Sequence, residues 1–220
     1  MKNHLSSMVK KRGYTILELL VAIAISGIFM GAIYSAYVSQ QRSTLGHEQV
    51  STMQRNLRSA MYYMEKEIRM AGCDPTGRTN AGIIQANANL MQFTGDIDGD
   101  GTIGTDENIT YSVLNNNLVR NGTTIGENID ALNFVYLDGD SPPNPLNPGI
   151  TDVSASSIPD IQSVQVTVLA RTGKENLHYT DSTTSYKNKQ NEDIFTPSGD
   201  GVHYRRKLLR TNVKCRNLGL

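Results

Sequence analysis

Apolar residues fill one continuous stretch near the start of the chain. Positions 19–38 contain no charged residue, and twenty residues is about the length that a helix needs to cross the hydrocarbon core of a bilayer. The segment ahead of this stretch is basic, with Lys2, Lys10, Lys11 and Arg12 and no acidic residue. The pattern predicts a membrane helix whose basic flank stays in the cytoplasm, with the rest of the chain across the membrane.

Beyond residue 38 the apolar positions narrow to a stripe with a helical period. Gaps of three and four separate its members, which are Val50, Met53, Leu57, Met61, Met64, Ile68 and Ala71. Charged side chains occupy the other face, and Gly72 and Asp74-Pro75 supply stop signals. We therefore expect one helix from about Thr15 to Ala71, whose second half must bury its stripe against the rest of the chain.

After Pro75 the pattern changes to short β-rich runs between clusters of Asn, Gly and Asp. These runs are 82–86, 90–94, 109–114, 118–120, 129–137, 161–170 and 204–214. They are typical of an antiparallel sheet, and Asn115–Asn117 and Asn121-Gly122 are typical of hairpin turns. The prediction is an α+β fold in which one sheet covers the helix stripe. Two long polar connections, 138–160 and 172–203, interrupt the strands, and their composition favours mobility.

Charge and catalytic motifs exclude several classes of function. The 220 residues have a formal charge of zero, and removing residues 1–13 leaves 17 basic and 21 acidic residues. No block of basic residues with interleaved aromatics indicates a nucleic-acid surface. The four histidines show no metal spacing, and G-x-S-x-G, P-loop and HExxH motifs do not occur. We therefore do not expect an enzyme.

The junction between the basic segment and the apolar stretch has a specific pattern. Gly13 is followed by Tyr14, and Glu18 stands five residues after the glycine, at the head of the apolar run. This resembles the class III leader of type IV prepilins and pseudopilins. The resemblance implies that a prepilin peptidase at the inner membrane cleaves after Gly13 and that the new amine of Tyr14 is methylated. The family usually has Phe at this position, and Tyr keeps the large first side chain.

The resemblance also divides the chain into parts. It implies a leader at 1–13, a transmembrane and filament-core helix at 14–38, an amphipathic continuation at 39–72 and a β-rich head at 73–220. Glu18 would then pair with the amine of Tyr14 of this or a neighbouring subunit inside the filament; the alternative is that Glu18 extends to the membrane interface.

Gly27 and Gly31 form a G-x-x-x-G pattern inside the apolar stretch. Small residues at this spacing allow close approach of helices in lipid. Glycine is also frequent in membrane helices in general. The alternative is therefore that the two glycines reflect this general frequency and have no role in helix packing.

The C-terminal half resembles the PilW type of minor pilin over 131–137, 163–171 and 204–217. This implies a structural subunit that primes pilus assembly or supports adhesion, motility or DNA uptake, with other pilins as partners. The head would lie in the periplasm and then in a cell-surface pilus. A J-type pseudopilin of type II secretion, which shares the leader and a strand-rich head, stays an alternative. A membrane-tethered enzyme or calcium-dependent binding module is the third hypothesis, and it requires convergent polar residues in the head.

An acidic segment between two expected strands fits a calcium loop. Residues 96–107 match D-x-[DN]-x-[DN]-G-x5-E at every fixed position. The expected Ca²⁺ ligands are the side chains of Asp96, Asp98, Asp100 and Glu107 and the carbonyl of Thr102. Because strands flank the segment, we predict a calcium loop set in a sheet; the alternative is a solvated acidic turn.

Two cysteines lie far apart in the sequence. Cys73 follows the long helix and Cys215 ends the last expected strand. In an exported chain the pair can form a disulfide, which would close a loop of roughly 140 residues and stabilise the fold by restricting the unfolded chain. The alternative is two buried or free thiols.

Overall fold

The computed structural model describes residues 13–218. Of the predicted leader, residues 1–12 lie outside the described residues. The chain forms two compact units, one up to His47 and one from Glu48 onward. Helix α1 contributes its first part to the one unit and its last part to the other.

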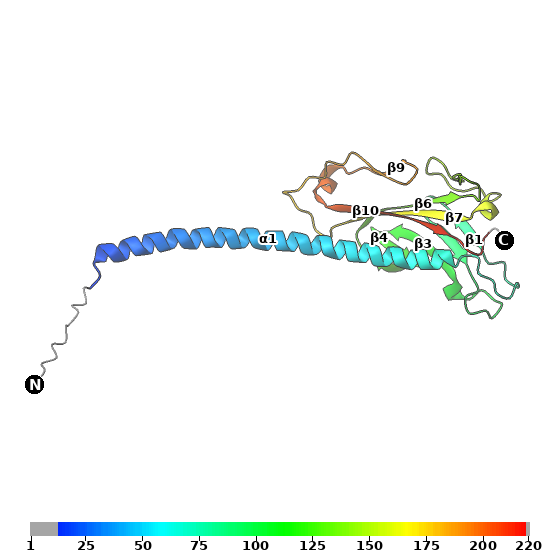
Figure 1. Cartoon of the computed structure of the whole chain (residues 1–220), viewed down its shortest axis with the longest axis horizontal. Coiled ribbons are helices and arrows are strands. Elements are labelled where there is room, and N and C mark those ends of the chain that lie inside the picture. Colours follow the sequence, from blue (N-terminus) through cyan, green and yellow to red (C-terminus); the bar gives the residue numbers. More distant parts are fainter. Residues whose placement is uncertain (1–12, 219–220) are drawn as a thin grey trace, which may run out of the picture. The chain divides into compact units, whose positions relative to one another are not determined.

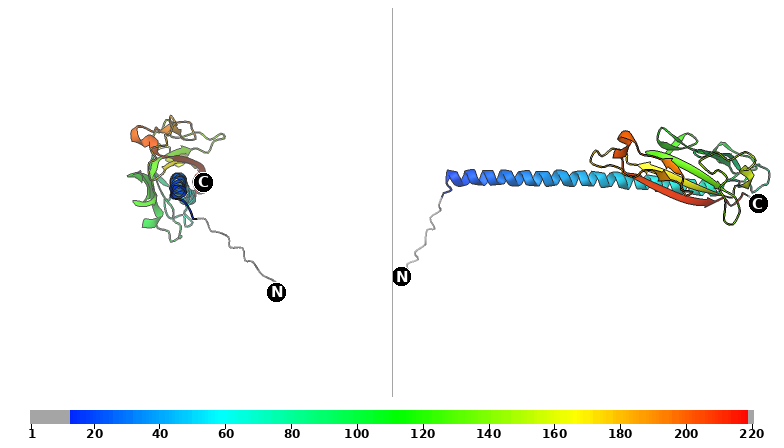
Figure 2. Two further views of the ribbon diagram at one scale, coloured as in Figure 1. Left: turned by 90° about the vertical axis from the view of Figure 1, so that its left-hand side faces the viewer. Right: turned by 90° about the horizontal axis from the view of Figure 1, so that it is seen from above.

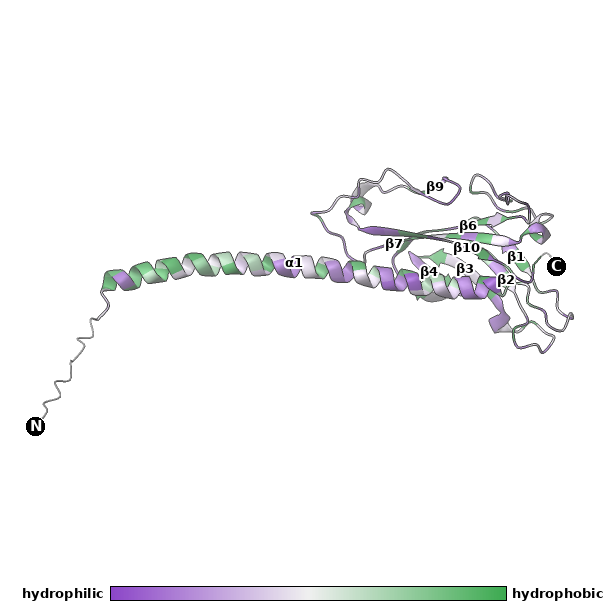
Figure 3. Ribbon diagram, viewed as in Figure 1, coloured by the Kyte–Doolittle hydropathy of each residue, from purple (hydrophilic) through white to green (hydrophobic). Residues whose placement is uncertain are grey.

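Helix α1 spans Ile16–Arg69 and contains 54 residues (Figure 1). These bounds lie within two residues of the predicted ones. Its first part carries exposed apolar side chains around its whole circumference, including Leu20, Ile28 and Phe29, and is coloured mostly as hydrophobic in Figure 3. The helix is long and apolar enough to cross a membrane by its length and composition.

The turn after α1 depends on a glycine. Gly72 has a φ of +76°, in the left-handed region that glycine adopts without steric cost. A Cβ at this position would lie 2.5 Å from Cδ2 of Leu218, so a side chain here would also force Leu218 to shift. The N–H of Gly72 donates to the carbonyl of Thr94 at 2.9 Å, which ties the helix end to the sheet that follows.

Between residues 13 and 218, ten strands form three antiparallel sheets (Figure 1). The five-stranded sheet has sequential order and consists of β1 (Ile83–Ala86), β2 (Met91–Thr94), β3 (Asn108–Leu114), β4 (Asn117–Arg120) and β5 (Thr123–Gly126). The three-stranded sheet has the order β10-β7-β6, with β6 at Ile129–Leu137, β7 at Ser163–Arg171 and β10 at Arg206–Lys214. The last sheet pairs β8 (Tyr186–Lys187) with β9 (Asp193–Phe195).

Both predicted hairpin turns are confirmed. Asn115 and Asn116 have φ values of 50° and 58° and join β3 to β4. Asn121 and Gly122, at 49° and 78°, join β4 to β5. Two successive residues with positive φ are the signature of a type I′ turn, whose twist matches that of the strands.

The core lies between the second part of α1 and the two larger sheets (Figure 2). The buried residues of the helix are Met53, Leu57, Ala60, Met61, Met64 and Ile68. They belong to one apolar cluster with Tyr111 and Leu118 of the five-stranded sheet and Phe134 and Val166 of the three-stranded sheet. The α+β architecture of a helix packed on antiparallel sheets is confirmed.

The prediction of a single sheet is wrong, because two sheets share the helix stripe. The chain leaves the five-stranded sheet at Asn128, which has a φ of 58°, and the next strand pairs with β7 instead. The sheets stay in contact at this point, where the N–H of Ile129 donates to the carbonyl of Asn116 at 2.7 Å, and again where the N–H of Phe134 donates to the carbonyl of Ala88 at 2.8 Å.

Segment 172–203 also differs from the expected mobile connection. It contains β8 and β9, and Nδ2 of Asn188 donates to Oδ1 of the buried Asn133 on β6 at 3.1 Å. Strands β6 and β7 are therefore covered on both faces, which explains why buried residues follow one another along β6 with little alternation. Strands of two and three residues in polar sequence leave no periodic signal to detect.

Candidate functional site

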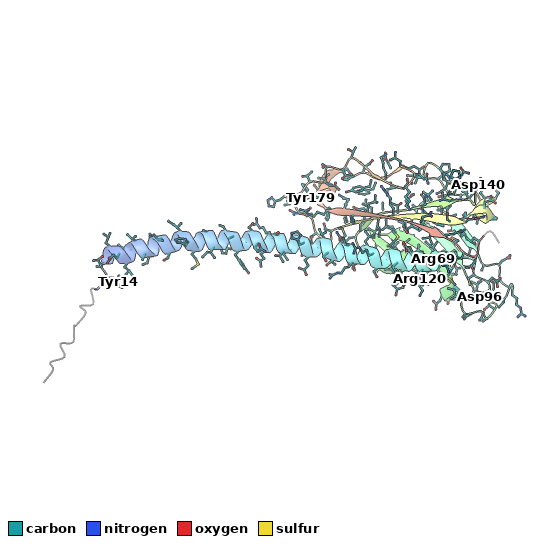
Figure 4. All side chains as sticks on the ribbon, in the orientation of Figure 1. Tyr14, Arg69, Asp96, Arg120, Asp140 and Tyr179 are labelled. Carbon is teal, nitrogen blue, oxygen red and sulfur yellow. The ribbon has the colours of Figure 1, made fainter. Side chains whose placement is uncertain are left out.

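The predicted cleavage point lies at the start of the described chain. Gly13 and Tyr14 precede α1 and have no regular secondary structure, and the side chain of Tyr14 is 92% exposed (Figure 4). The two residues lie outside the helix and are exposed, so the geometry is compatible with cleavage between them.

Glu18 forms a capping box with Thr15 at the start of α1. The N–H of Thr15 donates to Oε2 of Glu18 at 2.8 Å, and the N–H of Glu18 donates to Oγ1 of Thr15 at 3.2 Å. Both side chains are exposed. This role of Glu18 was not predicted from the sequence, although Thr-x-x-Glu ahead of an apolar run is a signature of a helix start.

Gly27 and Gly31 lie on exposed helix surface. A Cβ at either position would meet nothing within 4 Å. Packing inside the described chain therefore does not require these glycines, and a role in contacts between helices stays a prediction.

The acidic segment joins two adjacent strands, as expected. β2 ends at Thr94, β3 begins at Asn108, and these two residues pair across the ladder. The segment is also tied to the end of α1, because the N–H of Asp96 donates to the carbonyl of Cys73 at 2.7 Å and Oγ1 of Thr76 donates to Oδ2 of Asp96 at 3.4 Å. Figure 4 shows Asp96 at this end of the head.

Three of the four predicted carboxylate ligands come together. One oxygen each of Asp96, Asp98 and Glu107 lies within 4.8 Å of the others. Asp100 is not in this group, because its Oδ1 accepts from the N–H of Thr102 at 2.8 Å and from its Oγ1 at 2.7 Å. Both hydrogen bonds lower the pKa of Asp100, and the one from the side chain of Thr102 has the larger effect. Completing the predicted ligand set requires Asp100 to turn inward.

The backbone of the loop holds Asp96 in place. Gly99 and Gly101 have φ values of 76° and 82°, which fold the loop back over the carboxylate. The N–H of Gly99 donates to Oδ1 of Asp96 at 2.7 Å, and the N–H of Gly101 donates to Oδ2 at 3.0 Å. Asp96 is fully buried, and its position is therefore fixed by the fold.

Glu107 reaches back across the loop from its last position. Its Oε2 accepts from the N–H of Gly104 at 2.8 Å, and its Oε1 accepts from the N–H of Ile97 at 2.6 Å. These two backbone donors hold the pKa of Glu107 below its usual value. An ionised carboxylate beside two others is a donor set that suits a hard cation with oxygen ligands, so the cluster could hold a metal ion, and Ca²⁺ stays a prediction.

Both cysteines are free in the structure. Cys73 is half-buried and Cys215 is buried in the apolar core. This arrangement corresponds to the second alternative given above, and a disulfide between them stays a prediction.

A polar cluster that the sequence analysis did not predict fixes the second part of α1 to the five-stranded sheet. Nε of Arg120 donates to Oε2 of Glu67 at 2.9 Å, and the hydroxyl of Tyr111 donates to the same oxygen. Burial, and then the adjacent Glu67, raise the pKa of Tyr111. These contacts join residues more than forty positions apart, and no local sequence pattern predicts them.

Comparison with known proteins identifies the N-terminal segment. Residues 8–34 match the family model of the prokaryotic N-terminal methylation motif. No curated protein sequence matches the chain. Among solved structures, the chain is similar to a type IV-like pilin from Thermus thermophilus, with 15% identity and a TM-score of 0.48, over 76% of this chain and 98% of the other. A similarity of that strength carries no argument about function.

The family match confirms the predicted prepilin motif. It covers the end of the basic segment, Gly13, Tyr14, Glu18 and most of the apolar stretch. The chain is pilin-like in this segment, and the long helix packed on antiparallel sheets agrees with a pilin-like fold. Proteins with such a motif are in general processed by a prepilin peptidase and assemble with other pilins.

Proposed function

We propose that the chain is a minor type IV pilin. It is held in the inner membrane by the first part of α1 with its head in the periplasm, is cleaved after Gly13 and methylated on Tyr14, and enters a pilus through the helix. In the pilus it acts as a structural or priming subunit that supports adhesion, motility or DNA uptake.

One observation carries this proposal. The methylation motif at 8–34 runs directly into a helix whose most apolar window has none of its residues buried by the chain itself. A helix that is apolar all round needs lipid or other apolar helices around it. A pilin meets both needs in turn, first in the membrane and then in the filament.

Mass spectrometry of the mature protein from its native cells tests the proposal. We expect an N-terminus at Tyr14 that is heavier by one methyl group, and we expect the protein in filaments sheared from the cell surface. A mature chain that still carries residues 1–13, in cells with an active prepilin peptidase, would contradict the assignment.

The J-type pseudopilin shares the motif, the helix and the strand-rich head, so deletion of the gene must separate the two. Loss of surface filaments with normal protein secretion supports the minor pilin. Retained filaments with loss of secretion across the outer membrane supports the pseudopilin.

We also propose that the loop 96–107 binds Ca²⁺. The proximity of Asp96, Asp98 and Glu107 supports this, together with the glycine turns that fix Asp96. The bound ion would offset the repulsion among these carboxylates and hold β2 and β3 against the end of α1. Extracellular sites with Kd values of about 10⁻⁴ to 10⁻³ M are weak but are occupied where calcium is plentiful.

A further inference from the structure

Charge is unevenly distributed over the head. Residues 74–200 contain 17 acidic and six basic residues, whereas residues 201–220 contain six basic residues and no acidic one. The second part of α1 contributes a further group of cations on its exposed side. The head therefore has a basic part and an acidic part, although the formal charges of the whole chain sum to zero.

The cations of α1 form a stripe that faces away from the core. Its members are Arg55, Arg58, Tyr62, Lys66 and Arg69, which we call the basic stripe, and all are exposed. At 3.6 residues per turn they lie within roughly 80° of the helix circumference and extend for about 21 Å. The buried residues Leu57, Met64 and Ile68 lie on the opposite side.

The basic stripe has no anionic partner among the residues that the structure describes. Within residues 13–218, none of its four cations takes part in an ion pair. Glu65 stands at its edge and is half-buried. The stripe continues toward the C-terminal strand, because the N–H of the exposed Arg216 donates to the carbonyl of Arg69 at 3.4 Å, at the helix end that β10 reaches in Figure 2.

An acidic groove lies elsewhere on the same head. It has a volume of about 520 Å³ and is lined by Asp138, Asp140, Asp160 and Gln162, with no Lys or Arg among its lining residues. Asp140 and Asp160 are exposed. Backbone donation from Asn144 keeps the pKa of Asp138 low, so the groove is anionic at neutral pH.

The stripe and the groove of one molecule do not meet. Figure 4 shows Arg69 on the helix and Asp140 at the far side of the head, and no contact joins them. A basic surface and an acidic surface at different places on one subunit are complementary between copies. Contacts of this heterologous kind repeat from one subunit to the next and build closed rings, or open helical filaments where the rotation does not close.

We propose that the basic stripe of one copy docks into the acidic groove of the next copy. The inference rests on the proposed function and adds to it that at least two copies stand side by side in the assembly. A long polyanion is a poorer occupant, because 17 acidic residues in segment 74–200 would repel it. Tyr62 adds apolar contact between the cations, which favours a folded protein surface.

Zero-length carbodiimide cross-linking of the full-length protein tests the contact. Equal amounts of ¹⁴N- and ¹⁵N-labelled protein are mixed in detergent micelles, so that mixed-label peptides identify links between copies. We expect mixed-label links from Lys66 to Asp140 or Asp160. Lys66→Arg keeps the positive charge but has no amine for the carbodiimide reaction. We expect this variant to self-associate normally while the cross-linked peptide disappears.

Charge reversal gives a second measurement on the same material. Arg58→Glu with Lys66→Glu, or Asp140→Lys with Asp160→Lys, should weaken self-association of the full-length protein about tenfold in sedimentation experiments in the same micelles, because like charges then face each other. Combining all four changes should restore the dimer. Lys174→Glu with Lys189→Glu changes the net charge equally at exposed positions elsewhere and should have no effect.

Several results would overturn the inference. One is the absence of mixed-label links from Lys66; another is failure of the four-fold variant to recover. Binding of the stripe to DNA or to phosphatidylglycerol vesicles, with no link between copies, would assign it to a polyanion or a membrane instead. A mature N-terminus at Tyr14 and presence in sheared filaments would still support the proposed pilin, so the two proposals fail separately.

Discussion

Arg206 and Asp130 form an ion pair that is almost completely removed from water. Nε of Arg206 donates to Oδ2 of Asp130 at 2.6 Å, and the two side chains are 0% and 2% exposed. The same guanidinium reaches Oδ2 of Asp181 at 3.1 Å and lies over the ring of Phe195. One arginine of β10 thus attaches the polar segment 172–203 to the three-stranded sheet.

We expect Arg206→Met to destabilise the head by about 3–5 kcal/mol, because it leaves two buried carboxylates without their shared cation. Equilibrium denaturation measures the change. Lys207→Met, at the exposed neighbouring position, is the control and should stay within about 0.5 kcal/mol of the natural protein. Equal stability of the two variants would contradict a stabilising role for the buried cluster.

Acid should weaken the same attachment. Burial raises the pKa of Asp181, but donors from Tyr186, Thr183 and Arg206 outweigh it and leave the pKa lowered. A carboxylate with a lowered pKa stabilises the folded state above its unfolded pKa, near 3.9, and loses this contribution as the pH falls below that value. Asp181→Asn should therefore reduce the fall in stability between about pH 4 and pH 2.

The next prediction separates two roles of Glu18. As a filament residue it pairs with the amine of Tyr14; as an N-terminal cap it bonds Thr15. We expect Glu18→Ala to insert into the membrane normally but to be lost from sheared filaments. Thr15→Val removes the hydroxyl of the cap and keeps the carboxylate, at a cost of about 1 kcal/mol, so it should still assemble.

Quantitative blotting measures the amount of each variant in sheared filaments relative to its amount in total membranes. Glu18→Ala present in filaments at the natural level would rule out the pairing role. Equal loss of both variants would indicate that the cap, rather than the charge, is what assembly requires.

The local pattern of apolar and polar residues predicted the fold well in segments where that pattern has a single helical or strand period. The stripe from Val50 to Ala71 identified α1 and its buried face, and the Asn115 and Asn121 turns identified their hairpins, because these signals act over a few residues. The leader motif is equally local, since peptidases read a short segment.

Long-range choices were not predictable in this way. The sequence of β6 has the same strand signals whether it pairs with β5 or with β7. The sequence pattern therefore does not distinguish one sheet from two. The attachment of 172–203 depends on Arg206, Asp130 and Asp181, which are separated by 25 residues or more. Such pairs form only because the folded topology brings the residues together, and they cannot be predicted from a pattern in a single sequence.

The cysteines allow a direct chemical test. Burial raises the pKa of Cys215 to about 12, so its thiol should not react with iodoacetamide at pH 8 in the folded protein, whereas the half-buried Cys73 should. Intact mass should show one label in the folded state and two after denaturation. Cys73→Ser should abolish the first label.

A disulfide between the two cysteines gives a different pattern. No label would appear, folded or denatured, until a reductant is added. That result would establish the bridge and would require the Cys73 turn and the end of β10 to adopt a bonded geometry.

The calcium prediction rests on the loop that joins β2 to β3. Without metal, Asp96, Asp98 and Glu107 repel one another, and the loop holds both the hairpin and the end of α1 through Cys73 and Thr76. Binding to the folded state alone stabilises by about 1.4 kcal/mol at a tenfold excess of ligand over Kd, the excess that millimolar Ca²⁺ gives for a Kd of about 10⁻⁴ M. A soluble chain without residues 1–40 should therefore melt several degrees higher in millimolar Ca²⁺ than in chelator.

Two substitutions and a control make this test specific. Asp98→Ala and Glu107→Ala should abolish the calcium-dependent shift, whereas Asp106→Ala, which removes an exposed carboxylate outside the predicted ligand set, should keep most of it. Mg²⁺ should substitute poorly because it demands a tighter octahedral shell. Melting curves that coincide in calcium and chelator, with no heat of binding at millimolar calcium, would show that 96–107 is an acidic turn whose carboxylates are held by hydrogen-bond donors of the chain alone.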